Sequence, residues 1–278
     1  MDLTDITDIK KALRAFGAHS RKELGQHFLI DNTALSTIVE TADITKEDTV
    51  LEIGPGMGIL TRELLKRAKK VVAVELDEAM VGIVKTTCIK FPNLEVKNLD
   101  ILKFNPSDLG CYKLISNLPY YITSVVVRRF LEAENKPEEM VILVQREVAE
   151  RICAKPSRMS ILAVSVQFYG APSVVSVVPR TSFFPAPNVD SAILKIKVYK
   201  NPLFPNVNPA IFFRIVKAGF SVKRKQLINS LSGGLNINRE FAEKLLIDAG
   251  IDPMARAESL SMIDWNNLYK IYIKNTIK

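Results

Sequence analysis

The fold is decided by one stretch of the chain, Thr49-Val50-Leu51-Glu52-Ile53-Gly54-Pro55-Gly56-Met57-Gly58. Its first five residues predict a short buried strand, which runs directly into a glycine-rich loop. The residues that follow the loop, 59–67, predict a helix. A strand, a tight glycine turn and a helix in this order are typical of α/β proteins, in which strands and helices alternate.

The same alternation continues on the C-terminal side of this stretch. Strands are predicted at residues 71–74, 94–98, 112–116 and 140–145, with helices at 78–88 and 123–132. This order predicts a parallel, doubly wound sheet with right-handed crossovers. On the N-terminal side, residues 5–16 predict a helix, and Asp31 or Asn32 can cap a second helix that runs through Ala42.

The C-terminal part of the chain has a different character. Strands predicted at residues 174–178 and 192–199 flank a proline-rich loop, and Pro202 and Pro205 mark a linker. Beyond the linker, helices are predicted at residues 210–220, 225–231, 240–249 and 265–273. We therefore predict an α/β domain over 1–200, in which 1–30 form an N-terminal helix and a motif loop, and a small all-helical domain over 201–278.

Composition and charge limit the classes of protein to which the chain can belong. Hydrophobic residues make up 47% of the 278 residues and charged residues 24%, as in ordinary folded proteins. The net charge is +8, and residues 201–278 hold 11 Lys or Arg against 6 Asp or Glu, so they carry +5 of it. A basic helical tail suits a polyanionic partner, although basic proteins without such a partner are common.

The cysteines and histidines exclude several kinds of site. Cys88, Cys111 and Cys153 are odd in number and widely spaced, as expected of reduced thiols in a cytoplasmic protein. With only His19 and His27 in the chain, we expect no metal site. No apolar run approaches the roughly 20 residues that a membrane span needs, so we expect no membrane partner.

Four polar or glycine positions fall at the carboxyl ends of predicted strands, where open α/β sheets bind ligands. They are the Gly54 loop, Glu75, Asp100 and Asn117. Glu75 lies about twenty residues after the loop, where an acid can accept both hydroxyls of a ribose, and Asp100 could accept from an adenine amine. A single acid at a strand end often only caps the next helix. Two acids at strand ends on the same edge as the glycine loop favour a ligand-binding site.

The spacing of the glycines narrows the choice of ligand. Nicotinamide dinucleotides are typically bound by G-x-G-x-x-G, whereas this loop is G-x-G-x-G with Pro55 inside it. A turn of this form suits a nucleoside with an amino-acid tail and no phosphate, a description that S-adenosylmethionine fits. The alternative is an ordinary glycine-rich turn.

Asn117-Leu118-Pro119-Tyr120 predicts the chemistry. The exocyclic amine of adenine is a poor nucleophile, and a carboxamide oxygen with a nearby backbone carbonyl can accept its two hydrogens and aim the nitrogen. Pro119 restrains the turn, and Tyr120 offers a flat face to an unstacked base. The alternative is a plain strand-to-turn boundary, since Asn and Pro both favour turns.

Three further segments allow both a functional and a structural interpretation. In Gly25-Gln26-His27-Phe28-Leu29 we expect Phe28 and Leu29 to be buried, and His27 is better explained as a hydrogen-bonded loop residue than as a general base. The proline-rich loop from Ser182 to Ser191 could stack bases or could be a hairpin with core aromatics. Residues 223–225, on a helical pattern with Arg214 and Lys217, could contact RNA phosphates or form a solvated face.

Taken together, these segments resemble the KsgA-type small-subunit ribosomal RNA adenine dimethyltransferases. The resemblance covers nearly the whole chain, in the family's order. It is carried by Leu24-Gly25-Gln26-His27-Phe28-Leu29, Val50 to Gly58, Ala73-Val74-Glu75-Leu76-Asp77, Asn117-Leu118-Pro119-Tyr120-Tyr121, Phe183 to Ser191 and Phe220 to Leu227.

The resemblance implies a Rossmann-like S-adenosylmethionine-dependent domain with a helical C-terminal domain that binds rRNA. It implies dimethylation of two adjacent adenosines in the 3′-terminal hairpin of small-subunit rRNA, with the small-subunit precursor as partner and a role in its biogenesis. The cofactor residues would be His27, which stands where bacterial members usually have Asn, and Leu29, Gly54, Glu75, Asp100 and Asn117. Asn117 and the carbonyl of Leu118 or Pro119 would hold the amine, and Tyr120 and Phe183 would sandwich the base.

Three rival functions stay open. The erythromycin-resistance type of rRNA adenine methyltransferase shares fold and motifs but modifies the large subunit; the Asn-Leu-Pro-Tyr and Gly-Gln-His-Phe-Leu segments and the long tail favour the small-subunit type. A non-catalytic ribosome-assembly factor is disfavoured by the intact motifs, and a nicotinamide-dependent dehydrogenase by the loop spacing. No dimerisation stripe is evident, and we expect a cytoplasmic monomer.

Overall fold

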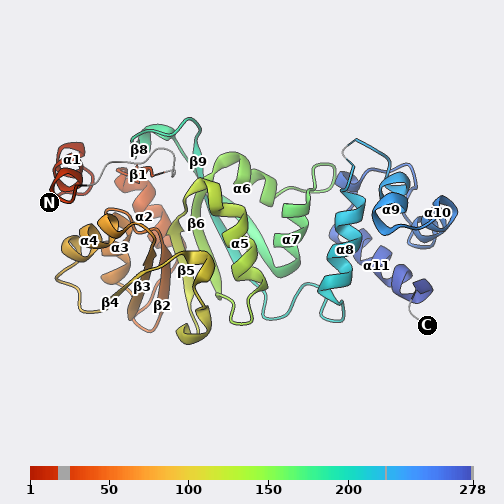
Figure 1. Cartoon of the computed structure of the whole chain (residues 1–278), viewed down its shortest axis with the longest axis horizontal. Helices are drawn as coiled ribbons and strands as arrows, with labels where there is room; N and C mark the ends of the chain where they lie inside the picture. Colours follow the sequence, from red (N-terminus) through yellow and green to blue (C-terminus); the bar gives the residue numbers. More distant parts are fainter. Residues whose placement is uncertain (18–25, 223, 277–278) are drawn as a thin grey trace. The chain divides into compact units, whose positions relative to one another are not determined.

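The computed structural model describes residues 1–17, 26–222 and 224–276 (Figure 1). Contacts within the chain divide it into two compact units. One consists of Met1–Ala149 and Ala171–Val198, and the other of Glu150–Gly170 and Tyr199–Lys278. The second unit thus draws on a segment from the middle of the chain as well as on the C-terminal part. The division of roles between residues 1–200 and 201–278 stays a prediction.

A mostly parallel sheet forms the centre of the first unit. In the described part of the chain it has seven strands, in the order β4-β3-β2-β5-β6-β9-β7. The first five of these are parallel to their neighbours, and β9 is antiparallel to β6. The strands are β2 (Thr49–Ile53), β3 (Lys70–Glu75), β4 (Leu94–Asn98), β5 (Lys113–Asn117), β6 (Glu139–Gln145), β7 (Gly170–Val178) and β9 (Ser191–Val198). The predicted parallel α/β sheet is confirmed.

Helices precede, connect and follow the parallel strands, and capping aspartates show why three of them begin where they do. Asp5, Asp31 and Asp77 cap α1, α2 and α4 by accepting from backbone N–H groups of the first turn. The helices are α1 (Ile6–Ala15), α2 (Asn32–Thr41), α3 (Ile59–Leu65), α4 (Glu78–Thr87), α5 (Thr123–Glu132) and α6 (Arg146–Ile152). The described part also contains short 3₁₀ turns at Ile101–Lys103, Pro106–Leu109, Tyr120–Ile122, Arg180–Ser182 and Ala257–Ser259. Within the described residues, no helix is long and apolar enough to cross a membrane.

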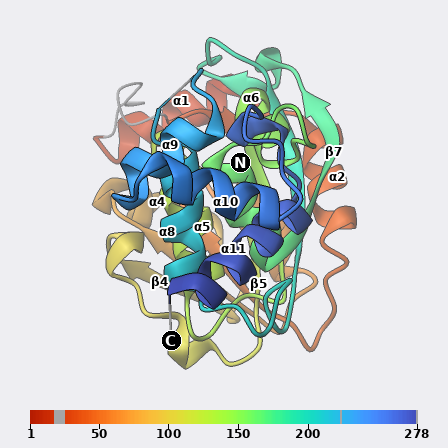
Figure 2. The ribbon, with the colours of Figure 1, turned by 90° about the vertical axis from the view of Figure 1, so that its right-hand side faces the viewer.

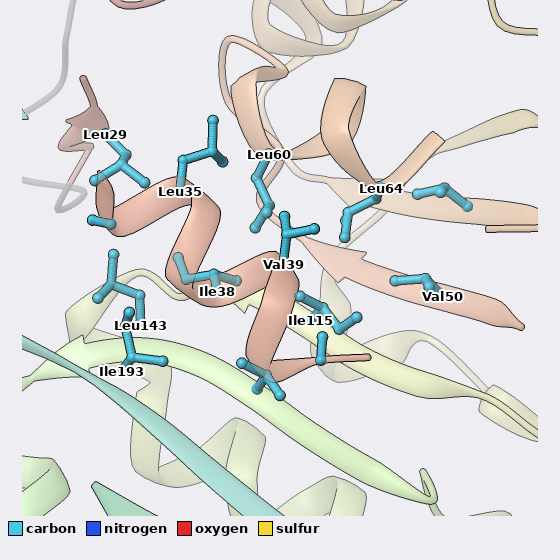
Figure 3. Close-up of a cluster of buried hydrophobic side chains, with 14 of the residues drawn as sticks. Leu29, Leu35, Ile38, Val39, Val50, Leu60, Leu64, Ile115, Leu143 and Ile193 are labelled. Carbon is cyan, nitrogen blue, oxygen red and sulfur yellow. The ribbon is translucent and has the colours of Figure 1, made fainter. Parts of the chain in front are cut away.

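One hydrophobic core holds α2 and α3 against the sheet (Figure 3). Ile38 and Val39 of α2 lie between Leu60 and Leu64 of α3 and the strand residues Ile115, Leu143 and Ile193. All of these side chains are buried. Each contributes about 1.5–3 kcal/mol through removal of apolar surface from water. This packing fixes the strand ends that carry the predicted ligand residues.

A second, two-stranded sheet joins distant parts of the chain. Strand β1 (Phe28–Leu29) pairs antiparallel with β8 (Phe183–Phe184), with Phe28 opposite Phe184 and Leu29 opposite Phe183. Phe28 and Leu29 are buried, as expected from the sequence. The pairing, which the sequence did not predict, brings the N-terminal motif loop and the proline-rich loop together.

The second unit is helical (Figure 2). It contains α7 (Ile161–Tyr169), α8 (Pro209–Gly219), α9 (Leu227–Leu235), α10 (Arg239–Asp248) and α11 (Met262–Thr276). Phe168 of α7 stacks on Phe212 of α8, and Trp265 of α11 is fully buried. The prediction that a helix begins at residue 225 was wrong, because Arg224 has a left-handed φ of 66° and Gln226 is an extended N-cap. Lys223 lies outside the described residues.

Candidate functional site

A cavity opens at the carboxyl edge of the parallel strands and gathers four segments that are distant in sequence. Its lining comes from residues 26–29, the glycine loop with its following helix, the end of β3 with the start of α4, and residues 117–121. The predicted site residues that line it are His27, Leu29, Gly54, Glu75, Asn117, Leu118, Pro119 and Tyr120. Most of the expected site residues therefore line one cavity. Asp100 and Phe183 are not among the described lining residues.

The glycine loop depends on conformations that other residues adopt with difficulty. Gly54 has a φ of +64° and Gly58 a φ of +86°, both left-handed. Gly58 is the N-cap of α3, and a Cβ added there would lie 2.8 Å from the Thr87 hydroxyl oxygen. The loop thus combines a special backbone path with close packing against the end of α4.

We expect Gly58→Ala to destabilise the first unit by about 2–4 kcal/mol, since left-handed strain and overpacking add. Urea unfolding of variant and wild type measures the loss. Gly250→Ala is the matched control, because Gly250 has a φ of +73° and a Cβ added there would meet nothing within 4 Å, so it should cost its own unit only about 1–2 kcal/mol. Equal losses in the two variants would contradict the packing argument.

Glu75 stands at the end of β3 and lines the cavity. Its Oε1 accepts a hydrogen bond from the Asp77 N–H at 2.9 Å, and Asp77 in turn caps α4. Burial raises the pKa of Glu75, against the lowering effect of the backbone N–H groups of Asp77, Leu76 and Gly56. A carboxylate held in this way at a strand end can accept hydroxyl hydrogens from a ligand.

Glu52 is a second carboxyl group of the cavity, and no role for it was predicted from the sequence. It lies in β2 and is 1% exposed. Neither its Oε2 nor the nearby Thr61 hydroxyl has a hydrogen-bond partner. Burial, together with the charge of Glu75, raises the pKa of Glu52 to about 8, although the Thr61 hydroxyl lowers it. The signal in the sequence was a lone acid inside an otherwise buried strand, which is costly without a partner.

The Asn117 turn presents two acceptors to the cavity. Asn117 Nδ2 donates to the His27 carbonyl oxygen at 3.2 Å, so its carboxamide oxygen faces away from that bond and can accept from a ligand. The Pro119 carbonyl already accepts from the Ile122 N–H and the Thr123 hydroxyl, both at 3.2 Å. Within the described part of the chain, no donor reaches the Leu118 carbonyl. Of the two carbonyls expected to hold an amine, that of Leu118 is the one without a hydrogen-bond donor among the described residues.

His27 and Tyr120 form one aromatic pair. Their ring centroids are 5.6 Å apart and their planes differ by 27°. His27 Nδ1 lies 2.7 Å from the Pro185 carbonyl oxygen and therefore donates to it, because a carbonyl can only accept. The Tyr120 hydroxyl lies 2.7 Å from that of Ser191, and burial raises the pKa of Tyr120. These contacts tie the Asn117 turn to the proline-rich loop.

Asp100 and Phe183 lie apart from the lining. Asp100 caps a short 3₁₀ turn by accepting from the Leu102 N–H at 2.9 Å. Burial, followed by the charges of Glu75 and Asp100, raises the pKa of the cavity residue Tyr121. Phe183 is 3% exposed and packs in the core with Ile193, so a base could stack on it only after the ring moves. The roles of both residues stay predictions.

The charge of the lining decides which ligands it fits. Three of its described residues, Glu52, Glu75 and Asp77, carry carboxyl groups, and none is a lysine or arginine. Phosphate groups would meet acids here without a cation, whereas a positively charged ligand is favoured. Among the residues that the structure describes, no cluster of His, Cys, Asp or Glu could hold a metal ion.

The chain matches proteins of one family over nearly its whole length. The family model described as "Ribosomal RNA adenine dimethylase" matches residues 17–274. The protein named "Ribosomal RNA small subunit methyltransferase A" from Dehalococcoides mccartyi (strain ATCC BAA-2266 / KCTC 15142 / 195) is 47% identical over 270 residues, which cover 96% of this chain and 93% of that protein. The protein of the same name from Clostridioides difficile (strain 630) is 40% identical, with 94% of each chain covered.

Two solved structures share the fold. The dimethyladenosine transferase from Plasmodium falciparum has a TM-score of 0.77 and 26% identity, and the match covers 88% of this chain and 97% of that one. The 23S rRNA methyltransferase ErmE has a TM-score of 0.72 and 30% identity, with 87% and 98% covered.

Proposed function

This chain belongs to the ribosomal RNA adenine dimethylase family, and we propose that it transfers methyl groups from S-adenosylmethionine to two adjacent adenosines in the 3′-terminal hairpin of small-subunit rRNA. The observation that carries the proposal is the convergence of the Asn117 turn, the glycine loop and Glu75 on one cavity. The turn supplies acceptors for an amine, and the acidic lining suits a cationic cofactor. Together they bring a nucleophile and a methyl donor to one place.

The lining fits S-adenosylmethionine. That cofactor carries a sulfonium and an ammonium group, and the acidic lining with its orphaned Glu52 oxygen offers positions for positive charge. Glu75, at the end of β3, is placed to accept the ribose hydroxyls, and the glycine loop leaves room for close backbone approach. We expect His27, Leu29, Gly54, Asp100 and Asn117 to complete the site. The cofactor supplies an electrophilic methyl group on a good leaving group.

The protein's part in the reaction is positioning. The Asn117 carboxamide oxygen and the Leu118 carbonyl accept the two hydrogens of the adenine amine and point the nitrogen lone pair into the cavity. The amine gains positive charge as the new bond forms, and both acceptors stabilise that charge. The proton leaves for solvent after transfer, so no strong general base is required. Tyr120, which is half-buried and lines the cavity, is the aromatic surface for the extruded base, with Phe183 as its expected partner after movement.

The small subunit is the favoured target for two reasons. The relatives at 37–48% identity are named small-subunit methyltransferases, whereas ErmE, named for 23S rRNA, is 30% identical. The basic residues Arg214 and Lys217 are exposed on α8, as expected of phosphate contacts that place RNA without reading its sequence. We propose a cytoplasmic role in small-subunit biogenesis.

The target is tested by supplying two substrates to the same enzyme. Purified protein and S-adenosylmethionine with a labelled methyl group are incubated with undermethylated 30S-type particles or with naked large-subunit rRNA. We expect label in the particles at a rate at least about 100-fold above that in large-subunit rRNA, a difference of about 2.7 kcal/mol in transition-state stabilisation. Preferential labelling of the large-subunit rRNA would favour the erythromycin-resistance type instead. Labelling of neither, with cofactor bound, would favour a non-catalytic factor.

A further inference from the structure

Helix α1 has no part in the proposed reaction, although it lies beside β1 and α4 (Figure 1). The match to the family model begins at residue 17, so α1 precedes the part of the chain that this model describes. Three buried side chains of α1 share one core cluster with three residues that line the cavity. The helix residues are Ile9, Ala12 and Leu13, and the lining residues are Phe28, Met57 and Met80. Packing therefore fixes the position of α1 relative to the cavity.

The outer face of α1 carries two neighbouring positive charges, Lys10 and Arg14, which we call the α1 stripe. Both residues are exposed and lie one helical turn apart, so their like charges repel each other. Among the described residues, neither forms an ion pair with an acid. Lys11 differs, because its Nζ lies 3.7 Å from Asp8 Oδ1. Unpaired cations near a helix C-terminus are often only a solvated face, so the surroundings of the stripe decide its role.

The α1 stripe lies next to the proline-rich loop, which contacts the surface expected to hold the target base. The Lys10 ammonium group is 5.4 Å from the centre of the Phe184 ring, and Phe184 belongs to β8. The carbonyl of the following residue, Pro185, accepts from His27 Nδ1 at 2.7 Å. The His27 ring in turn stacks on that of Tyr120. A short series of contacts therefore connects the α1 stripe to the aromatic surface of Tyr120.

The cavity itself offers no cation to the RNA backbone. An adenosine that is extruded for methylation stays linked to its neighbours through phosphate groups. The described lining contains three carboxyl groups and no lysine or arginine, so it repels phosphate. The phosphates on either side of the target must therefore be held outside the cavity. The α1 stripe provides two unpaired cations there, on a helix that is packed against the cavity wall.

We propose that the α1 stripe, Lys10 and Arg14, binds phosphate groups of the RNA strand next to the target adenosine. The inference rests on the proposed function, because it takes RNA as the substrate. Contacts of this kind position a strand without reading its sequence. The guanidinium group of Arg14 presents a planar fork of donors that suits phosphate, and the Lys10 ammonium group acts as a compact charge. Helix α1 thereby gives the first unit an RNA contact of its own.

The salt dependence of binding tests the proposal. Filter binding of undermethylated 30S-type particles is measured at constant magnesium and at potassium chloride concentrations from about 50 to 200 mM. Each phosphate contact contributes about 0.7–0.9 to the slope of log K against log salt concentration. The double variant Lys10→Gln/Arg14→Gln should therefore lower the slope by about 1.4–1.8 and bind about tenfold more weakly at about 0.1 M salt. Its affinity for S-adenosylmethionine should not change, because neither residue lines the cavity.

Three further variants assign the effect to the stripe. Lys11→Gln removes a charge from the same helix that already lies near Asp8, and should leave the slope unchanged. Lys10→Arg/Arg14→Lys keeps both charges and should bind like the wild type. Arg14→Gln alone keeps the contact of Lys10 with Phe184 and should show about half of the loss in slope. This single variant tests the proposal even if the double variant does not fold.

A wild-type slope in the charge-removing variants would overturn the inference. Weaker binding by the same factor at every salt concentration would also overturn it, because that pattern marks a structural role of α1. An equal loss of slope in Lys11→Gln would contradict the assignment to Lys10 and Arg14. These three results leave the proposed function intact, since methylation by the wild type is measured separately. Wild-type protein that binds S-adenosylmethionine but neither binds nor methylates the particles would contradict the proposed function as well.

Discussion

Replacing Asn117 with alanine should lower kcat for adenine methylation by about 100- to 1,000-fold, the usual cost of removing one group that stabilises charge in a transition state. The carboxamide oxygen is available because Nδ2 is already bonded to the His27 carbonyl at 3.2 Å. Without that oxygen the amine keeps only the Leu118 carbonyl, and its lone pair is no longer aimed. The turn itself should survive, since Pro119 and the 3₁₀ turn after it do not depend on the Asn117 side chain.

The measurement is single-turnover transfer of labelled methyl at saturating cofactor. The affinity for S-adenosylmethionine, taken from calorimetry, should change by less than about tenfold, because only one of several contacts is lost. Asn201→Ala is the control, since it makes the same substitution at an exposed position outside the site. Turnover near that of the wild type in Asn117→Ala would remove this residue from the mechanism.

Replacing Glu75 with alanine should weaken binding of S-adenosylmethionine by about 10- to 100-fold, while the affinity for RNA changes little. Hydrogen bonds to a charged acceptor are worth about 1.5–3 kcal/mol each, and Glu75 lines the cavity at the end of β3. Calorimetry measures the cofactor and filter binding measures the RNA.

Glu78, a second acid near Glu75 in the sequence, provides the control variant. Glu78 lies in the first turn of α4, is exposed and does not line the cavity. Glu78→Ala should therefore leave cofactor affinity within about twofold of the wild type. If Glu75→Ala weakened cofactor and RNA equally with the fold intact, the ribose assignment would be wrong.

The parallel sheet and the outline of the cavity could be predicted from the sequence because both follow from local signals. Apolar runs of strand length, each closed by a glycine, an acid or an asparagine, locate the carboxyl ends of β2, β3, β4 and β5. Parallel pairing then brings those ends to one edge. No long-range information is needed for Gly54, Glu75 and Asn117 to meet.

Contacts between distant segments were out of reach of local signals. The β1–β8 pairing and the hydrogen bond from His27 to Pro185, 158 residues away, depend on tertiary packing. For this reason the sequence suggested Phe183 as a surface for base stacking, although its ring packs in the core. Helix α7 was missed for a different reason. Its sequence, Ile161–Tyr169, is apolar on nearly all sides, and a buried run without periodicity does not separate helix from strand.

The burial of Glu52 points to a functional residue that the hydrophobic pattern of the sequence did not reveal. The strand Thr49–Ile53 was predicted as buried, and its one acid stood inside it. The burial of a carboxyl group without a partner is a functional signal, because the cost must be offset by something that the chain does not contain. In the structure, the Glu52 side chain lines the cavity at the carboxyl edge of the sheet.

The most direct test of the account is mass spectrometry of nucleosides from small-subunit rRNA, after incubation of undermethylated particles with the protein and S-adenosylmethionine labelled in its methyl group. The account predicts labelled N6,N6-dimethyladenosine at two adjacent positions near the 3′ end, with the signal lost in Asn117→Ala. It would be contradicted if wild-type protein that binds the cofactor produced no labelled dimethyladenosine, or produced it only in large-subunit rRNA.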